Sequence, residues 1–502
     1  MGINFKVLFV SPEVVPFAKT GGLADVSGSL PRYLKKLGCD IRVALPFYRT
    51  VREKKLPYET LFKDVEIPIK GEMLKADINQ NSLNGDIPVY FVKHDEFYDR
   101  KNLYGTSKGG YLDNAERFIF FCRSILELCR KANFEPDIIH CHEWQTGLIP
   151  VYLKTLYNKD KLFSKTATLY SIHNVAYQGI FGEEVFEKTC LPKRFFSSNG
   201  VEHYGKINFM KAGIIYADII NTVSQKYSEE IQTEEYGCGL QRILKDRANV
   251  LFGVMNGVDY TEWNPEADKF IVANYNANNL SGKMKCKEDL LLQFNLPISL
   301  KNRPLLGVVS RLAEQKGFDL LAETLDDLMA YDIGFILLGT GNEIYHKLFQ
   351  EFARRYPERI GVYIAYDNKL AHKIEAGADI FLMPSRYEPC GLSQIYSLKY
   401  GTIPLVRATG GLDDTIKDYN SKDGTGNGFK FGEYKANAFL DKVKEALKIF
   451  SKREKWDQLM KNAMSEDFSW ERSAKVYLGL YEKAFSMRTV VKEETQYKSK
   501  IL

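Results

Sequence analysis

The feature that most constrains this fold is a regular alternation of short apolar runs with amphipathic helical segments. Runs such as Lys6–Val10, Ala167–Ile172 and Ile380–Met383 are largely apolar, which is typical of strands buried on both faces of a parallel sheet. Each run leads into a polar or glycine-containing loop and then into apolar residues at helical spacing, as between Leu23 and Leu37. The pattern predicts doubly wound α/β domains, in which ligands bind at the carboxyl ends of the strands.

Length and charge narrow the class of protein. A chain of 502 residues is too long for one hydrophobic core, so at least two domains are expected. Apolar residues make up 45% and charged residues 26%, as in an ordinary soluble globular protein. The net charge of +5 comes without a long block of one sign, which does not favour nucleic acid and fits a site for a phosphorylated small molecule.

The cysteines and the N-terminus bear on location. Eight cysteines are scattered without CxxC pairs, which predicts reduced thiols. The first predicted strand begins at Lys6, leaving no room for a signal peptide, and no apolar run approaches the ~20 residues of a membrane span. We therefore expect a cytoplasmic protein with no membrane partner.

A polar, asparagine-rich stretch at Tyr260–Ser281 divides the chain into two similar halves. Before it we expect a helix over Lys206–Ala217; from Ala436 the chain is largely helical and ends in a polar tail at Lys492–Leu502. The predicted division is an N-terminal domain over residues 1–255, a connection over 256–290, a C-terminal domain over 291–475, and a helix with a polar tail over 476–502. Two such domains predict a ligand-binding cleft between them.

In the first half, candidate site residues follow two predicted strands. Lys19 lies in a Lys-Thr-Gly-Gly loop, where glycine lets the backbone approach a ligand and lysine can neutralise a phosphate. A tight turn with a solvated lysine would explain the same residues, and Asp25 would then only stabilise the first helical turn. His173 follows Ala167–Ile172 and so lies at the ligand-binding edge, although a structural histidine also fits.

The sequence His140-Cys141-His142-Glu143-Trp144 ends another predicted strand and raises the question of zinc. In a strand, His140 and His142 share one face while Cys141 points away, and no second ligand cluster follows. We therefore expect no metal.

In the second half, Glu388 precedes a Pro-Cys-Gly turn that opens a predicted helix at Leu392–Tyr400. Backbone amides at this helix start, and at Thr409-Gly410-Gly411 before the next helix, suit an anionic diphosphate. A carboxylate beside two anion sites suggests a nucleotide-sugar, with Glu388 accepting sugar hydroxyls while the amides hold phosphates. The alternative is an acid that only stabilises a helix N-terminus.

Arg311 and Lys316 flank one loop of the same half, so that two cations can converge on a diphosphate, unless they are only a surface basic pair. A transferase with a diphosphate leaving group needs these residue types. Cations stabilise the departing phosphate, a carboxylate positions the sugar, and exclusion of water favours transfer over hydrolysis.

Six motifs make a family resemblance plain: KTGGLADV from Lys19, HNVAYQG from His173, NGVD from Asn256, SRLAEQKG from Ser310, PSRYEPCGL from Pro384 and RATGGLDDT from Arg407. In this order they resemble the bacterial glycogen synthase and plant starch synthase family, of the glycosyltransferase family 5 type. The resemblance implies a GT-B fold, in which two Rossmann-like domains face each other across a deep cleft. It also implies elongation of an α-1,4-glucan from ADP-glucose with retention of anomeric configuration.

The resemblance also implies roles for residues. Lys19 would contact the donor diphosphate, and Arg311 and Lys316 would carry the leaving-group charge. Glu388 would hold the donor glucose hydroxyls, with His173 beside the sugar ring. The other implied substrate-binding residues are Gly22, Asp25, Asn174, Asn256, Gly339, Thr340, Gly341, Tyr366 near the base, Cys390, Gly391, Leu392, Thr409, Gly410 and Gly411. The implied partners are ADP-glucose and glycogen or starch, with no metal or other cofactor.

Two positions differ from common patterns. Where the family usually has His-Asp-Trp, this chain has Glu143, whose carboxylate is one methylene further from the backbone. Many related retaining transferases carry a second glutamate eight residues after the first, where this chain has Tyr396, as expected for this bacterial type.

Three other functions remain open from the sequence. They are the same chemistry with UDP-glucose or for another α-glucoside, a catalytically silent glucan-binding protein, and a dinucleotide-dependent oxidoreductase. The silent protein is disfavoured because Lys19, Arg311, Lys316 and Glu388 are all present. The oxidoreductase is disfavoured because the chain lacks GxGxxG with an acid ~20 residues further on.

Overall fold

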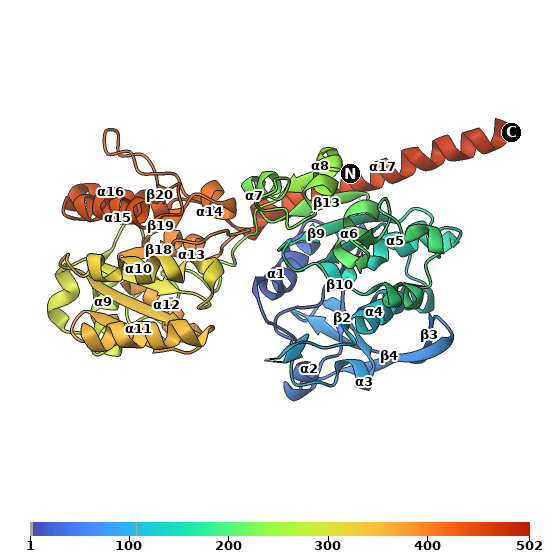
Figure 1. The fold of residues 1–502 in the computed structure, drawn as a ribbon, viewed down its shortest axis with the longest axis horizontal. Helices are drawn as coiled ribbons and strands as arrows, with labels where there is room; N and C mark the ends of the chain where they lie inside the picture. Colours follow the sequence, from blue (N-terminus) through green and yellow to red (C-terminus); the bar gives the residue numbers. More distant parts are fainter. Residues whose placement is uncertain (1–3, 107, 502) are drawn as a thin grey trace. The chain divides into compact units, whose positions relative to one another are not determined.

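The computed structural model describes residues 4–106 and 108–501. The chain forms two compact units. Unit 1 comprises Met1–Val223, Ser228–Gly257 and Trp470–Leu502, and unit 2 comprises Ser224–Tyr227 and Val258–Ser469. Both are α/β units with parallel sheets, as the alternating pattern predicts (Figure 1).

Unit 1 is built on a nine-stranded sheet. Its order is β14 (Leu251–Gly253), β13 (Ile219–Thr222), β9 (Ala167–Ile172), β8 (Ile138–His142), β1 (Lys6–Val10), β2 (Asp40–Pro46), β5 (Ile87–Lys93), β4 (Glu72–Leu83) and β3 (Glu59–Ile69). The first seven strands in this order pair in parallel, whereas β4 and β3 add an antiparallel extension. Strands β1, β8 and β9 are buried almost throughout, because helices cover both faces of a doubly wound sheet.

The helices of unit 1 are α1 (Gly22–Lys36), α2 (Arg49–Glu53), α3 (Asp95–Tyr98), α4 (Asn114–Lys131), α5 (Leu148–Lys154), α6 (Phe209–Tyr216), α8 (Gln241–Asp246) and α17 (Trp470–Ile501). Helix α7 (Gln225–Glu230) is divided between the units, because Ser224–Tyr227 belongs to unit 2. Small strands β10 (Ile180–Phe181), β12 (Lys206–Asn208) and β11 (Glu202–His203) form a separate three-stranded sheet, and β6 (Gly105–Thr106) pairs with β7 (Gly109–Gly110).

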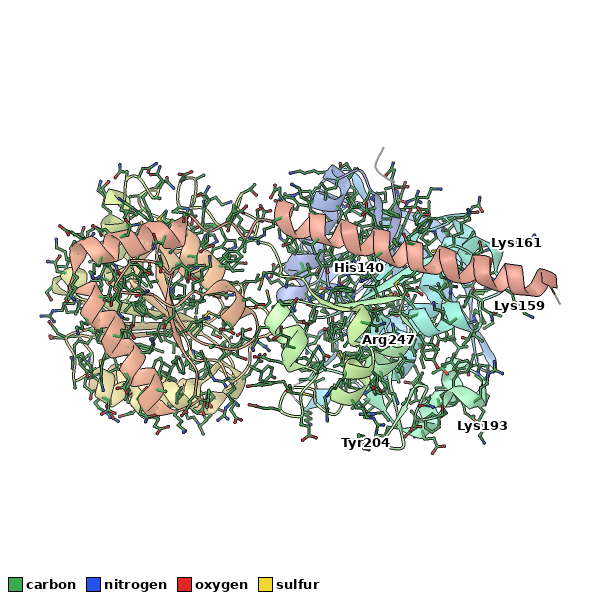
Figure 2. All side chains as sticks on the ribbon, turned by 90° about the horizontal axis from the view of Figure 1, so that it is seen from above. His140, Lys159, Lys161, Lys193, Tyr204 and Arg247 are labelled. Atoms are coloured by element: carbon green, nitrogen blue, oxygen red, sulfur yellow. The ribbon has the colours of Figure 1, made fainter. Side chains whose placement is uncertain are left out.

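The C-terminal helix α17 belongs to unit 1 and lies against α1 and strands β8, β9 and β13. Polar contacts fix it there: the Tyr481 hydroxyl lies 2.8 Å from His140 Nδ1, and Asn221 Nδ2 donates to the Tyr477 hydroxyl over 3.1 Å. Figure 2 shows His140 beside this long helix. Because these groups are buried, their hydrogen bonds offset the cost of removing them from water.

Unit 2 contains a six-stranded, all-parallel sheet. Its order is β17 (Ile360–Ile364), β16 (Gly334–Gly339), β15 (Leu305–Val309), β18 (Ile380–Met383), β19 (Ile403–Arg407) and β20 (Phe429–Phe431). Counted along the chain, this is the order 3-2-1-4-5-6 of a Rossmann-type sheet.

Alternate residues of these strands enter two separate cores, as the two-residue period of a strand requires. Leu306 packs with α10 (Phe318–Leu328), α11 (Glu343–Arg355), α15 (Ala436–Phe450) and α16 (Arg453–Met464). Its neighbour Leu305 packs with α9 (Ser281–Gln293) and α12 (Asn368–Gly377) on the opposite face. Two short helices, α13 (Ser393–Lys399) and α14 (Gly410–Thr415), follow β18 and β19.

Residues 256–290, which the sequence suggests as a connection, fold largely into unit 2. The main segment of unit 2 begins at Val258, and α9 is part of its core. The Trp263 ring is stacked between His372 and Tyr396, with centroid distances of 3.7 and 3.9 Å. The asparagines bond locally instead, since Asn276 Oδ1 accepts from two backbone amides just after it. Their polarity therefore reflects turns rather than a loose linker.

Two other segments differ from expectation. The predicted helix Lys206–Ala217 begins only at Phe209, because Lys206–Asn208 pairs with β10 and β11 as strand β12. Asn208 then accepts from the amide of Lys211 and so caps the helix. At the other end, α17 runs to Ile501, where the sequence suggests a polar tail from Lys492.

Among the residues that the structure describes, no helix combines the length and the apolar character that a membrane span requires.

Candidate functional site

The strand order of each sheet reverses beside one strand. In unit 1, β1 lies between β2 and β8; in unit 2, β15 lies between β16 and β18. The connections on either side of such a strand therefore lead in opposite directions. In open α/β sheets, ligands bind beside this reversal, at the carboxyl ends of the strands. The predicted site residues of each unit follow the carboxyl ends of its strands or open the helix after them.

In unit 2, the structure brings Lys316 and Glu388 together across this reversal. Lys316 follows β15 and Glu388 follows β18, and the Lys316 Nζ lies 2.6 Å from Glu388 Oε2. The side chains are only 18% and 7% exposed, and the Ser385 hydroxyl also donates to Glu388 Oε2 over 3.1 Å. Glu388 Oε1 has no hydrogen-bond partner within the described part of the chain, so it can accept from a bound hydroxyl.

Other predicted residues of unit 2 are open to solvent at the same edge. Arg311 is exposed, and its guanidinium makes no hydrogen bond or ion pair with the described residues. Thr340 and Gly341, after β16, are exposed, and Tyr366, after β17, is 77% exposed. An exposed guanidinium and an exposed phenol ring suit a phosphate and the face of a base, respectively.

The glycines of this edge are required because loops approach one another closely. A Cβ at Gly410, whose φ is 45°, would lie 2.0 Å from the Glu388 carbonyl oxygen, and one at Gly411 would lie 2.0 Å from that of Cys390. The Gly411 amide donates to the Glu388 carbonyl over 3.0 Å. Thus this amide holds the Glu388 loop in place rather than pointing to a ligand. Gly339 packs against the Ser310 carbonyl in the same way.

The remaining predicted residues of this region are packed around the same loops. Thr409 occupies the N-cap position of α14, while Cys390, Gly391 and Leu392 directly precede α13, with Cys390 buried.

In unit 1, Lys19 is exposed and its Nζ lies 2.7 Å from Asp25 Oδ1. Gly22, beside them, is the exposed first residue of α1. The loop is fixed by a residue that sequence reasoning missed, the buried Glu13. Its carboxylate accepts from the amides of Thr20 and Gly21 and from the hydroxyls of Thr20 and Tyr104. The only signal in the sequence is an acid between β1 and the glycine loop.

His173 and Asn174 follow β9, and Glu143, the residue after β8, holds their backbone. Glu143 Oε1 accepts from the His173 amide over 2.5 Å and from the Asn174 amide over 2.9 Å. The carboxyl does not face solvent, since Glu143 is 7% exposed, and burial raises its pKa to about 8. Glu143 also has a positive φ of 63°, a backbone conformation that is strained for a non-glycine residue. The Glu143 carboxyl thus serves a backbone contact.

Within the described ranges, no group of three or more His, Cys, Asp or Glu residues is placed to hold a metal ion. His140 and His142 share one face of β8 and are buried, while Asn256, which follows β14, is buried with its Oδ1 unpaired among the described residues.

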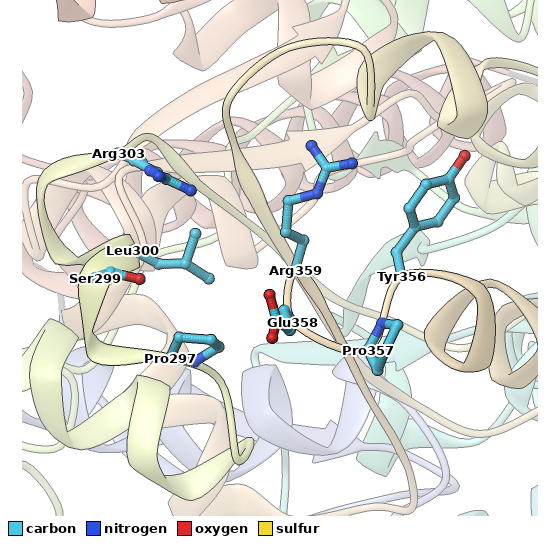
Figure 3. A pocket seen from close by; sticks show the side chains of 8 residues that line it. All are labelled: Pro297, Ser299, Leu300, Arg303, Tyr356, Pro357, Glu358 and Arg359. Carbon is cyan, nitrogen blue, oxygen red and sulfur yellow. The ribbon is translucent and has the colours of Figure 1, made fainter.

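A cavity of about 310 Å³ lies at the amino ends of the unit 2 strands (Figure 3). It is lined by Arg303, just before β15, by Arg359, just before β17, and by Pro297, Ser299, Leu300, Tyr356, Pro357 and Glu358. It contains none of the predicted site residues. The cavity lies at the amino ends of the strands, whereas the candidate site lies at their carboxyl ends.

Comparisons with known proteins agree with this geometry. A family model described as the starch synthase catalytic domain matches residues 6–246, and one described as glycosyl transferases group 1 matches residues 295–463. A glycogen synthase of Koribacter versatilis is 46% identical over 96% of this chain and 99% of its own length. One of Thermotoga maritima is 45% identical, with the same coverage.

Solved structures give the same result. The catalytic domain of starch synthase IV from Arabidopsis thaliana, bound to ADP and acarbose, is 32% identical and matches with a TM-score of 0.89, covering 96% of this chain and all of that one. The fold and the two family models define a retaining glycosyltransferase with the GT-B fold. Within this class, the chain belongs to the glycogen synthase and starch synthase family.

The raised pKa of Glu143 predicts a measurable pH dependence. Its pKa rises from 4.5 to about 8 on folding, so its contribution to stability is complete below pH 4.5 and is lost as the pH passes 8. Glu143→Gln keeps the oxygen that accepts both amides but does not titrate. We expect the variant to gain stability relative to the wild type as the pH rises from about 4.5 to about 8, as measured by urea unfolding.

Glu375 provides a matched control in unit 2. Burial raises its pKa to about 8 as well, but its carboxylate accepts from Ser397 and has no hydrogen bond to a described loop of the candidate site. Glu375→Gln should therefore give a similar pH-dependent gain with unchanged transferase activity. If the stability of Glu143→Gln followed the wild type at every pH, the inference that Glu143 is protonated near neutral pH would be wrong.

Proposed function

We propose that this protein transfers glucose from ADP-glucose to the non-reducing end of an α-1,4-glucan, with retention of configuration, as a glycogen synthase. The observation that carries the proposal is the Lys316–Glu388 pair, buried at the reversal of strand order in unit 2. A cation and a carboxylate held within 2.6 Å of each other can address the two halves of a nucleotide-sugar, the diphosphate and the sugar hydroxyls.

Each charged residue then has a distinct task. Arg311, Lys316 and, in unit 1, Lys19 neutralise the diphosphate, which carries its charge both before and after the glycosidic bond breaks. Glu388 accepts sugar hydroxyls through Oε1, while Lys316 and Ser385 hold its other oxygen. His173 lies beside the sugar ring. Groups fixed in advance in this way stabilise the transition state without reorganising during the reaction.

Two observations support the proposed nucleotide and acceptor. The starch synthase IV structure is bound to ADP and acarbose, and ADP is the product that remains after transfer from ADP-glucose. Tyr366, which is largely exposed after β17, offers a ring on which the base can stack.

We propose a cytoplasmic location, because all eight cysteines are free, as is typical of a reducing compartment.

The direct test is incorporation of labelled glucose into a glycogen primer. We expect transfer from ADP-glucose with a clearly higher kcat/KM than from UDP-glucose. Preference for UDP-glucose would keep the fold and the reaction but refute the proposed donor. Release of free glucose without chain growth, or no turnover of either donor, would refute the function.

Glu388 and Lys316 should respond differently to substitution. Glu388→Gln keeps the shape but weakens charge-assisted hydrogen bonds worth roughly 1.5–3 kcal/mol each, so kcat should fall about 10- to 100-fold with ADP affinity little changed. Lys316→Ala should weaken ADP binding as well as slow transfer, because the diphosphate carries charge in substrate and product alike. Calorimetric Kd values for ADP and steady-state kinetics measure both.

The matched control is Asp379, which precedes β18 at the other end of the strand that leads to Glu388. It also pairs with a lysine, Lys287, at 2.5 Å and is largely buried. Asp379→Asn should lower stability while the folded protein retains wild-type kcat. Wild-type turnover in Glu388→Gln would show that the loop after β18 does not hold the donor sugar.

Metal independence follows from the same assignment of charges. Three basic side chains neutralise the diphosphate, so we expect full transferase activity in excess chelator. The measurement compares initial rates with and without EDTA, and with magnesium or manganese restored. Loss of activity that either metal restores would contradict this prediction.

A further inference from the structure

His142 is a buried histidine beside the site for which the proposed reaction gives no role. Its ring contacts those of Phe9 and His140, with centroid distances of 4.2 and 4.1 Å. Its Nδ1 lies 3.0 Å from Nε2 of His173, the histidine placed beside the donor sugar. Its Nε2 is buried and has no hydrogen-bond partner among the described residues.

The ring N–H hydrogens of His142 and His173 can be assigned by counting the available donors and acceptors. Burial lowers the pKa of His142 well below its ordinary value and that of His173 to about 3, so both rings are neutral and each carries one N–H. A contact of 3.0 Å requires one hydrogen between the two nitrogens. If the His142 proton were on Nε2, a buried N–H would lack an acceptor, which is rarer and more costly than an unpaired acceptor.

The His142 proton is therefore on Nδ1 and is donated to His173 Nε2, and the proton of His173 must be on its own Nδ1. That nitrogen has no hydrogen-bond partner in the described part of the chain. Glu143, the next residue in the sequence, holds the backbone amide of His173. Two consecutive residues at the end of β8 thus fix the ring and the main chain of His173.

We infer that His142 is a positioning residue that holds His173 in the tautomer with its hydrogen on Nδ1, so that this N–H can donate to an oxygen of the bound glucosyl donor. The inference rests on the proposed function, because it needs a sugar beside His173. His142 touches no substrate in this account; it acts only through the ring of His173. A wrong tautomer leaves the geometry intact but presents a lone pair where a donor is needed, at a large cost in rate.

Two substitutions of His142 separate positioning from packing. His142→Leu fills similar space but cannot donate, so kcat should fall at least about tenfold while the Kd for ADP stays within about threefold. His142→Asn places an amide N–H near the position of Nδ1 and should restore most of the lost rate. A packing role would give no such difference between Leu and Asn at equal stability.

His140 is the matched control, because it is buried on the same face of the same strand. Both of its ring nitrogens are already bonded, to the Tyr481 and Ser171 hydroxyls, and it does not contact His173 through a hydrogen bond. His140→Leu should lower the Tm, whereas kcat for each folded molecule should remain that of the wild type.

The tautomer itself can be read from two-bond ¹H–¹⁵N correlations in protein labelled at its seven histidines, with His173 assigned by its loss in His173→Gln. We expect the Nδ1–H form for His173 in the wild type. An Nε2–H form there, or wild-type kcat in His142→Leu, would overturn the inference. If the wild type transferred no glucose, the proposed function would fail instead. If His142→Leu did not fold, the wild-type spectrum and His142→Asn would still decide.

Discussion

The reversal of strand order at β15 in unit 2, and at β1 in unit 1, is the constraint on which the candidate site depends. Parallel strands end at a common edge, and divergent connections at one point of that edge place two loops side by side. The loops after β15 and β18 therefore meet, although Lys316 and Glu388 are 72 residues apart in sequence. A single ion pair then holds the Glu388 carboxylate, for which we propose contact with the donor sugar.

The two units hold their loops by different means. In unit 1, two buried carboxyls accept from loop amides: Glu13 from Thr20 and Gly21, and Glu143 from the residues after β9. In unit 2, backbone carbonyls do the same, and glycines such as Gly411 permit the close approach. Glu143 therefore acts on the main chain of the loop after β9.

The sequence predicted the strands well where they are continuous apolar runs, and β9 and β18 agree to the residue. It failed where pairing with distant strands overrides local preference, as in β12, which looks like the start of a helix. Motifs identified Glu388 and its loop but not its pairing with Lys316, because side-chain contacts between loops leave no periodic signal. Glu13 was missed for a related reason: its partners are mostly backbone amides, which every residue except proline carries.

The return of α17 to unit 1 has a consequence for the order of events during synthesis. The chain leaves unit 1 after Gly257 and re-enters it at Trp470, which packs directly against Gly257. All of unit 2 therefore emerges from the ribosome before the helix that bonds to His140 and Asn221 through Tyr481 and Tyr477. Domains generally fold as units as they are made. Unit 2 can thus be complete while unit 1, which begins the chain, still waits for its last helix.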